Sequence, residues 1–484
     1  MDLLTGFGLL AVVFTVSALA AGLVERAPLS FPMIFLGLGL VVGNMEILTV
    51  DLHDPVLEVV ATLTLSFVLF LDAVNLDAGV SKRDLLVPAL ALGPGTIAVI
   101  LLVAGAAVVL LDFPLELALL LGAILSSTDP VVLRDVLRDR RIPSSIRRAL
   151  SVEAGTNDVV VLPVVLILIA VSNADVGGAA EWLWFSVELF VLGPAAGFVV
   201  GAVGAWLMSR TDARFGIRRE YQSLYGVGLV LGSYAAGVAV GGDGFLAAFA
   251  AGLAVTFLNQ TLCDCFLEFG EAASEMTMLV AFVLFGVVLA PRLGDVSIVG
   301  TLLLAAFTIF VARPLTIWTL LSVRATRLSH GARAFIAWFG PRGLNSLLFA
   351  LLVVAAGVRG AELLFAVTGL VVLVSVIAHG TSATPLTAWY GRRIAAETLD
   401  EERESTATGL FRSAGVDDDA RLDVDDLARM LASDDPPIVL DVRTRSQFER
   451  DDVQIPGSVR VYPDEVTAWA TDTSPDKLVV LYCT

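Results

Sequence analysis

Long apolar stretches recur through the first 390 residues of this chain, and they limit what the chain can fold into. Most run for about 18–25 residues between charged or Pro/Gly-rich breaks, the length that an α-helix needs to cross the hydrocarbon core of a bilayer. Hydrophobic residues make up 57% of the 484 residues, and charged residues only 17%. This pattern excludes a soluble globular fold and predicts an all-α membrane protein with many spans.

The hydropathy pattern predicts about thirteen transmembrane helices. The loops between them alternate, and arginine gathers in every second loop except the segment 259–275, which falls on the same side but is acidic. Because cytoplasmic loops carry the excess of Lys and Arg, we expect the N-terminus outside the cell and the C-terminal region in the cytoplasm. The expected spans are 5–24, 30–46, 54–76, 85–111, 116–137, 149–171, 181–208, 220–239, 244–258, 272–290, 297–322, 333–356 and 360–388.

Two neighbouring spans carry acidic residues at bilayer depth. A carboxylate there costs at least roughly 2.5–3.5 kcal/mol, so it marks a functional site by default. A basic hairpin, RDRRIPSSIRR (138–148), joins the two spans. Their polar residues are Thr128, Asp129, Glu153, Asn157 and Asp158.

Proline interrupts the first of these two spans. Pro130 removes a helical N–H and clashes with the carbonyl one turn earlier, so the helix is expected to break near Thr128. Such a break is tolerated at membrane depth only where the freed backbone lines a cavity or is buried in protein. Freed carbonyls beside carboxylates predict a cation site.

A second proline lies at a matching place in the other half of the chain. The segment WFGPRGLNSLL (338–348) contains Pro341 in the twelfth expected span, and the first break lies in the fifth. If the spans divide into six, a connector and six, the two positions correspond. We therefore predict inverted six-helix repeats with two broken helices that cross at the site. The alternative is that Pro341 only kinks its span.

These motifs resemble those of the NhaP-type sodium/proton antiporters, the prokaryotic relatives of animal sodium/proton exchangers. The resemblance implies a homodimer in a lipid bilayer, each protomer having a dimerisation bundle and a six-helix core that moves between two faces. The motifs are SSTDP (126–130), Glu153 with Asn157-Asp158, GGDGFLAAFAAGLAV (241–255), Ala312-Arg313-Pro314, Gly340-Pro341-Arg342-Gly343 and HGTSATPL (379–386).

Two positions depart from the pattern of that family. Ala154 follows Glu153 where the family commonly has serine, which removes a possible hydroxyl ligand. Asp72 stands in FLDAVNLD (70–77) where the family usually has a glutamate followed by glycines. Both departures bear on the ligand set and on the choice of ion.

We expect Asp158 to carry the cation and the proton in turn, because it must lose a proton to bind a cation and regain one to return. Asp129 could ligate the Na⁺ ion, directly or through water, or it could cap a helix at the break. Thr128 could offer a carbonyl or a hydroxyl oxygen. Asp72 could complete the ligand shell or be an ordinary residue at a helix end.

Other polar residues are expected to balance charge at the site. The resemblance suggests that Glu153 pairs with Arg313, and an unpaired charge at this depth is costly. Arg342 is expected to neutralise the crossing, at the C-terminus of a half-helix or against an aspartate. Asn157 is uncharged, and a single carboxylate beside it supports one proton per cation. His379 could sense pH or be a structural histidine.

The last 94 residues differ in composition from the rest of the chain. From Gly391 onward there are 21 acidic and 11 basic residues. Their pattern predicts a small α/β domain with parallel strands, and segments 440–443, 455–458 and 479–483 resemble a rhodanese domain. In that family an anion-binding loop follows the cysteine that corresponds to Cys483, and only Thr484 follows it here. We expect a partial and inactive rhodanese-like domain.

Three domains follow from these boundaries: a transmembrane antiporter domain (1–390), a cytoplasmic linker (391–415) and the rhodanese-like domain (416–484). The whole predicts an electroneutral Na⁺/H⁺ antiporter of the cytoplasmic membrane that works by alternating access. We expect no enzyme activity, no cofactor and no nucleic-acid partner. K⁺/H⁺ exchange on the same fold is the near alternative. A permease serving a sulfurtransferase-like tail is the distant one, which the intramembrane aspartates disfavour.

Overall fold

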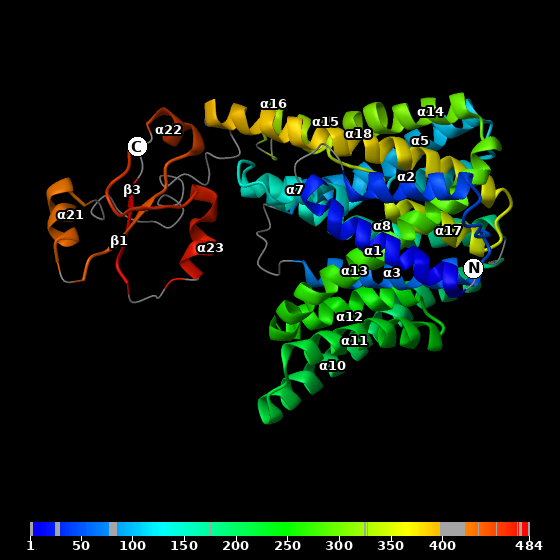
Figure 1. The fold of residues 1–484 in the computed structure, drawn as a ribbon, viewed down its shortest axis with the longest axis horizontal. Helices are drawn as coiled ribbons and strands as arrows, with labels where there is room; N and C mark the ends of the chain where they lie inside the picture. The colour runs from blue at the N-terminus through cyan, green and yellow to red at the C-terminus, as the bar shows by residue number, and fades with distance from the viewer. Residues whose placement is uncertain are drawn as a thin grey trace.

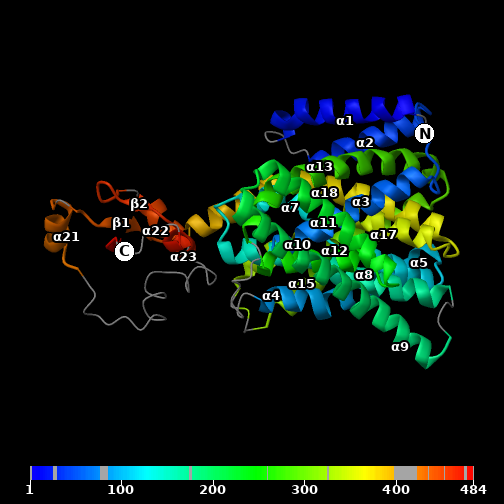
Figure 2. The same ribbon diagram turned by 90° about the horizontal axis from the view of Figure 1, so that it is seen from below.

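The computed structural model describes residues 3–24, 30–76, 85–173, 177–258, 260–323, 326, 328–396, 422–433, 435–451, 453–471, 473 and 477–482. It shows a bundle of long helices with a small α/β region at one end (Figure 1). Seen from a second direction, the α/β region again stands beyond the end of the bundle, far from α9 (Figure 2).

The helices of the bundle follow one another along the chain with short connections. The first part contains α1 (Leu3–Val24), α2 (Phe31–Asn44), α3 (Pro55–Val74), α4 (Leu86–Leu90), η1 (Ala91–Gly95), α5 (Thr96–Leu111), α6 (Leu115–Ile124), α7 (Pro130–Arg138) and α8 (Ser144–Ser172). The middle part contains α9 (Ala179–Val187), η2 (Glu188–Leu192), α10 (Gly193–Phe215), α11 (Arg219–Ala239), α12 (Gly244–Leu258), α13 (Gln260–Leu289) and η3 (Ala290–Gly294). The last part contains α14 (Ile298–Phe307), η4 (Thr308–Ala312), α15 (Arg313–Leu320), α16 (His330–Trp338), α17 (Leu344–Ala355) and α18 (Ala361–Ala396).

Each of the expected spans coincides with a helix or with consecutive helices. Within the described residues, seven helical segments are long and apolar enough to cross a bilayer, and five shorter apolar helices accompany them. Several helices extend beyond the expected spans. Helix α13 begins at Gln260, so most of the segment 259–275, expected to be an acidic loop, is helical. Hydropathy marks where a helix leaves the bilayer, and a helix can continue into water with charged residues.

Both prolines interrupt their spans as predicted. Helix α6 ends at Ile124 and α7 begins at Pro130, while α16 ends at Trp338 and α17 begins at Leu344. A second matching pair is formed by η1 and η4, which are five-residue π-helical turns inside the fourth and eleventh expected spans. These correspondences agree with a division into six spans, a connector and six. The inverted orientation of the two repeats stays a prediction.

The helices pack as two groups. One group, the glycine-packed bundle, contains α2, α3 and α10–α13, and the other, the crossing bundle, contains α5–α8 and α14–α18. Helices α10 and α12 approach very closely, since a Cβ on Gly197 would lie 1.9 Å from the backbone oxygen of Ala247. Small residues allow such close backbone contact between membrane helices. Helix α3 links the groups through contacts with α8 and α17.

The C-terminal region has the predicted parallel α/β pattern. Among its described residues the parallel strands are β1 (Ile438–Asp441), β2 (Val459–Arg460) and β3 (Val479–Tyr482), in the order β2-β1-β3. Its helices are α21 (Val424–Leu431), α22 (Arg445–Arg450), η7 (Pro463–Glu465) and α23 (Val466–Thr471). Cys483, which corresponds to the cysteine of the rhodanese family, lies outside the described residues, as does most of the expected linker.

Candidate cation-binding site

The two interrupted spans cross at their extended segments. The backbone N–H of Asp129 donates to the carbonyl of Pro341 at 2.8 Å. The Nη1 of Arg342 donates to the carbonyls of Ser126 and Ser127, both at 2.8 Å. These carbonyls follow the end of α6, where a half-helix presents partial negative charge. Arg342 is 1% exposed, so of the two alternatives for this residue, the structure places it at the C-terminus of a half-helix.

Asp129 caps two helices at once. Its Oδ1 accepts the backbone N–H of Val131 at 2.8 Å, which is the N-cap interaction of α7. Its Oδ2 accepts the backbone N–H of Leu344 at 2.8 Å, at the start of α17. Two otherwise unsatisfied helix N–H groups are thereby paired. The contacts are those of the capping alternative, and they occupy both oxygens of the carboxylate.

Glycine makes room for charged groups at the second break. A Cβ on Gly343 would lie 1.8 Å from Oδ2 of Asp129, and a Cβ on Gly340 would lie 1.7 Å from Nε of Arg313. Neither distance is possible for a real side chain. The two glycines of Gly340-Pro341-Arg342-Gly343 therefore allow an aspartate and an arginine from other helices to reach the crossing.

Asp158 lies fully buried between the two breaks. Its Oδ1 accepts a hydrogen bond from Oγ of Ser127 at 2.6 Å, and its Oδ2 accepts one from Nδ2 of Asn345. Ser127 belongs to the first break and Asn345 follows the second. Neither residue was selected by the sequence analysis. The available signal was local, since both are polar residues inside the motifs that contain the two prolines.

Three buried oxygens near the breaks have no hydrogen-bond partner among the described residues. They are Oγ1 of Thr128, Oδ1 of Asn157 and Oδ2 of Asp72. An unsatisfied buried acceptor is destabilising, and native proteins rarely leave one without a partner, a water or an ion. The described part of the chain contains no group of three His, Cys, Asp or Glu side chains that could chelate a metal. A bound cation would thus rely on a mixture of carboxylate, hydroxyl and amide oxygens.

Glu153 and Arg313 form a buried ion pair. Nη1 of Arg313 lies 2.7 Å from Oε1 of Glu153, and both side chains are about one-twentieth exposed. The Nη2 of Arg313 also donates to the carbonyl of Phe339 at 2.9 Å, at the start of the second break. The pair expected from sequence is therefore present in the geometry, and it supports the second break.

Both ring nitrogens of His379 lie within hydrogen-bond distance of a backbone carbonyl. Nδ1 lies 2.9 Å from the carbonyl of Ser375, and Nε2 lies 3.2 Å from the carbonyl of Trp338. The side chain is 1% exposed. These contacts are those of the structural alternative for this residue.

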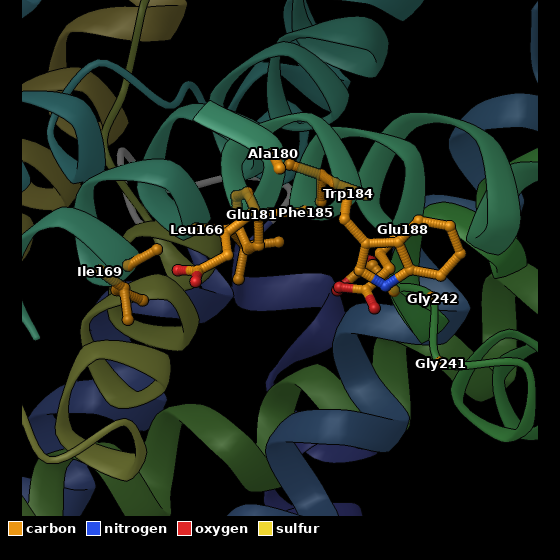
Figure 3. Close-up of a pocket in the computed structure, with 12 residues that line it drawn as sticks. Leu166, Ile169, Ala180, Glu181, Trp184, Phe185, Glu188, Gly241 and Gly242 are labelled. Carbon is orange, nitrogen blue, oxygen red and sulfur yellow. The ribbon is translucent and has the colours of Figure 1, made fainter. Parts of the chain in front are cut away.

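One cavity lies against residues 151–155 of α8, before Asp158, and another lies against residues 166–170, after it. A cavity of about 300 Å³ lies between α3, α7, α8 and α13, and its lining includes Asp72 and Pro130. A larger one of about 710 Å³ is lined by Leu166, Trp184, Glu188 and their neighbours (Figure 3). Leu166 lies eight residues beyond Asp158, about 12 Å along the helix. The smaller cavity is the one whose lining contains residues of the candidate site.

The sequence matches the family model "Sodium/hydrogen exchanger, transmembrane" over residues 11–389. The K⁺/H⁺ antiporter NhaP of Alkalimonas amylolytica is 27% identical over 391 residues, which cover 78% of this chain and 66% of that protein. The K⁺/H⁺ antiporter NhaP2 of Shewanella sp. (strain MR-4) is 30% identical over 384 residues, covering 77% of this chain and 65% of that protein. The match thus spans about two thirds of the length of these relatives.

A solved structure shows the same fold. The sodium proton antiporter MjNhaP1 from Methanocaldococcus jannaschii superposes with a TM-score of 0.67 at 20% sequence identity, covering 81% of this chain and all of that one. At this identity the likeness concerns the fold alone. It supports the description of a helical, polytopic membrane protein.

Proposed function

The chain belongs to the sodium/hydrogen exchanger family, a family of multi-pass secondary transporters rather than enzymes, and we propose that it exchanges a monovalent cation for a proton across a membrane. One proton moves per cation, so the cycle is electroneutral. Alternating access exposes the site first to one face and then to the other. The observation that carries this proposal is the buried carboxylate of Asp158, held between two helix breaks, together with buried oxygens that have no partner in the described part of the chain.

The cation and the proton compete for Asp158. When the carboxylate is charged, a cation offsets the charge and takes Thr128, Asn157 and Asp72 as further oxygen ligands. When it is protonated, the site is neutral and returns without a cation. Asp129 contributes its negative charge and keeps the half-helices in place, since its oxygens already accept two backbone N–H groups.

We place K⁺ ahead of Na⁺ as the transported ion. The sequence-based preference was for Na⁺, but the relatives described above are named K⁺/H⁺ antiporters. A second reason is the ligand set, which has alanine at position 154 where a hydroxyl is usual in the antiporters that the sequence resembles. Na⁺ and Li⁺ are the matched ions for comparison.

The smaller cavity suggests that this conformation opens toward the cytoplasm. It is lined by Arg134 and Arg138 of α7, close to the arginine-rich hairpin that the positive-inside rule places in the cytoplasm. Near it, Nη1 of Arg134 lies 3.0 Å from Oε2 of Glu275. We further propose a homodimer, with the glycine-packed bundle as the dimerisation part and the crossing bundle as the moving part.

For the C-terminal region we propose a rhodanese-like domain. Its parallel sheet supports an α/β domain of this kind. The boundaries 1–390, 391–415 and 416–484 are part of the same proposal. Helix α18 reaches Ala396, six residues beyond the first boundary.

The test is ion-dependent proton flux in proteoliposomes, with K⁺, Na⁺ and Li⁺ in turn. We expect Asp158→Asn to reduce exchange to background while the protein stays folded, because losing a buried charge relieves desolvation and opens no cavity. Ser127→Ala is the matched control, since it removes one hydrogen bond to Asp158 and keeps the carboxylate. Exchange that persists in purified Asp158→Asn would refute the role of Asp158.

A further inference from the structure

The C-terminal region contacts the helix that carries Asp158. The backbone N–H of Ser144, the first residue of α8, donates to Oδ2 of Asp464 at 2.6 Å. The hydroxyl of Ser144 donates to the backbone oxygen of Asp464 at 3.3 Å. Next to it, Nη2 of Arg147 lies 2.9 Å from Oε1 of Glu465. Two adjacent acidic residues of η7 thus hold the first turn of α8.

Asp464 acts as the N-terminal cap of α8. The N-cap position of α8 is Pro143, which has no side chain that can accept a backbone N–H. The first N–H groups of a helix have no partner within the helix, and the helix dipole makes this end positive. A carboxylate is the group that both effects favour. Here it comes from a segment 320 residues away in the sequence.

This contact is buried and charged. The Asp464 side chain is 5% exposed, and Nη1 of Arg445 lies 3.1 Å from its Oδ1. Burial raises the pKa of Asp464, but the Arg445 guanidinium and the Ser144 N–H outweigh burial and hold the pKa below its usual value. The carboxylate is therefore charged at neutral pH. Surface ion pairs contribute little, whereas a buried and fully bonded carboxylate can position two surfaces.

The same region contacts two further parts of the crossing bundle. Nη2 of Arg445 donates to the carbonyl of Arg140 at 3.0 Å, in the α7–α8 loop. Nη2 of Arg450 donates to the carbonyl of Ala396 at 3.4 Å, at the end of α18. Helix α18 also holds the second break, because Oγ of Ser375 accepts the backbone N–H of Arg342 at 2.7 Å. The segments joined by the tail therefore belong to the helices that hold both breaks.

We propose that the C-terminal region is a docked regulatory domain, attached through Asp464 at the start of α8, and that its attachment keeps the crossing bundle competent for exchange. Docking ties α8, the α7–α8 loop and α18 together at one end, so that these elements move as one body. Undocking frees that end and slows exchange. The regulatory effect rests on the proposed exchange function, whereas the docking does not.

A substitution in α8 can separate docking from the folding of the tail. Ser144→Pro removes the N–H that Asp464 accepts and places a ring where the carboxylate lies. Proline is well tolerated at the first position of a helix. The preceding residue, Pro143, already has φ −53° and ψ 142°, the conformation that a residue before proline requires. Ser144→Ala is the matched control, because it keeps the N–H and loses only the longer hydroxyl contact.

Two measurements on the full-length protein test the proposal. Hydrogen–deuterium exchange over residues 462–466 reports docking, and proton flux in proteoliposomes reports cation/proton transport. We expect Ser144→Pro to increase deuterium uptake over 462–466 and to slow cation/proton exchange at least threefold. Ser144→Ala should stay close to the unaltered protein in both measurements. Unchanged uptake in Ser144→Pro would refute the docking. Increased deuterium uptake with unchanged or faster cation/proton transport would refute the regulatory role.

A charge reversal provides an independent check. Arg147→Glu and Glu465→Arg should each increase uptake over 462–466 and slow exchange, and the double variant should recover both. Failure of the double variant to recover would count against the proposal. If the unaltered protein shows no exchange of any monovalent cation, the proposed function and the regulatory effect both fail, and deuterium uptake still decides whether the tail docks.

Discussion

The two helix breaks look alike in the sequence but differ in what they contribute. The first break, 125–129, brings a carboxylate that caps α7 and α17. The second, 339–343, brings Arg342, which binds carbonyls of the first, and two glycines that admit side chains from elsewhere. The first break thus supplies negative charge, and the second supplies positive charge and space. A crossing of two broken helices is stable here because the breaks are complementary.

Asp158 depends on this complementarity. One of its oxygens is held by Ser127 of the first break, and the other by Asn345 just after the second. A change at either break should therefore alter the position of the Asp158 carboxylate. The following predictions run from the largest expected effect to the smallest.

Breaking the Glu153–Arg313 pair should have the largest effect on stability. Glu153→Gln or Arg313→Met leaves one buried charge without its partner, which costs about 3–5 kcal/mol. Arg313 also holds the carbonyl of Phe339, so its loss should loosen the second break more than the first. Thermal unfolding of the purified variants measures the loss. The double variant should lose less than the sum of the two, and strictly additive losses would show that the residues do not interact.

Filling the space at the second break should have a smaller effect. Gly343→Ala places a methyl group against Asp129, and we expect a loss of about 1–3 kcal/mol in the free energy of unfolding, as for other overpacked sites. Gly105→Ala in α5 is the control, because its Cβ would meet nothing within 4 Å. The measurement is the unfolding temperature together with the exchange rate. Equal stability of the two variants would contradict the idea that the second break must supply space.

The pH dependence of the exchange rate should show whether protons act at Asp158 or at a separate sensor beside the second break. Competition at Asp158 predicts a bell-shaped dependence of the exchange rate on pH. At low pH the site is protonated and does not bind the cation, and at high pH the deprotonated site cannot regain a proton. With the cation well above its binding constant, a tenfold increase should move the acidic limb down by about one pH unit, because the charged state gains about 1.4 kcal/mol.

His379 gives the control for this measurement. It contacts the carbonyl of Trp338 beside the second break, so a pH sensor there would act through it. We expect His379→Gln to keep the cation dependence of the acidic limb. The experiment measures the limb at several cation concentrations under clamped membrane potential. A limb that stays at one pH across a hundredfold range of cation would favour a separate sensor over competition at Asp158.

The backbone features of this protein could be predicted from sequence because they have local causes. Pro130 and Pro341 interrupt their helices wherever the rest of the chain lies, since a missing N–H and a ring clash act within one turn. The apolar runs and the parallel strands of the tail are local in the same sense. Helix ends were less predictable. Hydropathy reports the edge of the bilayer, and α13 and α18 continue past it.

Most partners of the polar groups were decided only by the tertiary structure, whereas the Glu153–Arg313 pair was already suggested by the family resemblance. Asp129 binds Leu344 across 215 residues, Asn345 binds Asp158 across 187, and Asp464 caps α8 across 320. The sequence alone determined that buried carboxylates were present and that each would need a partner, because an unpaired charge at this depth is too costly to leave. It could not determine which atoms would meet them. A hydrogen bond depends on distances of a few tenths of an ångström, and only the packing of sequence-distant helices sets distances that small.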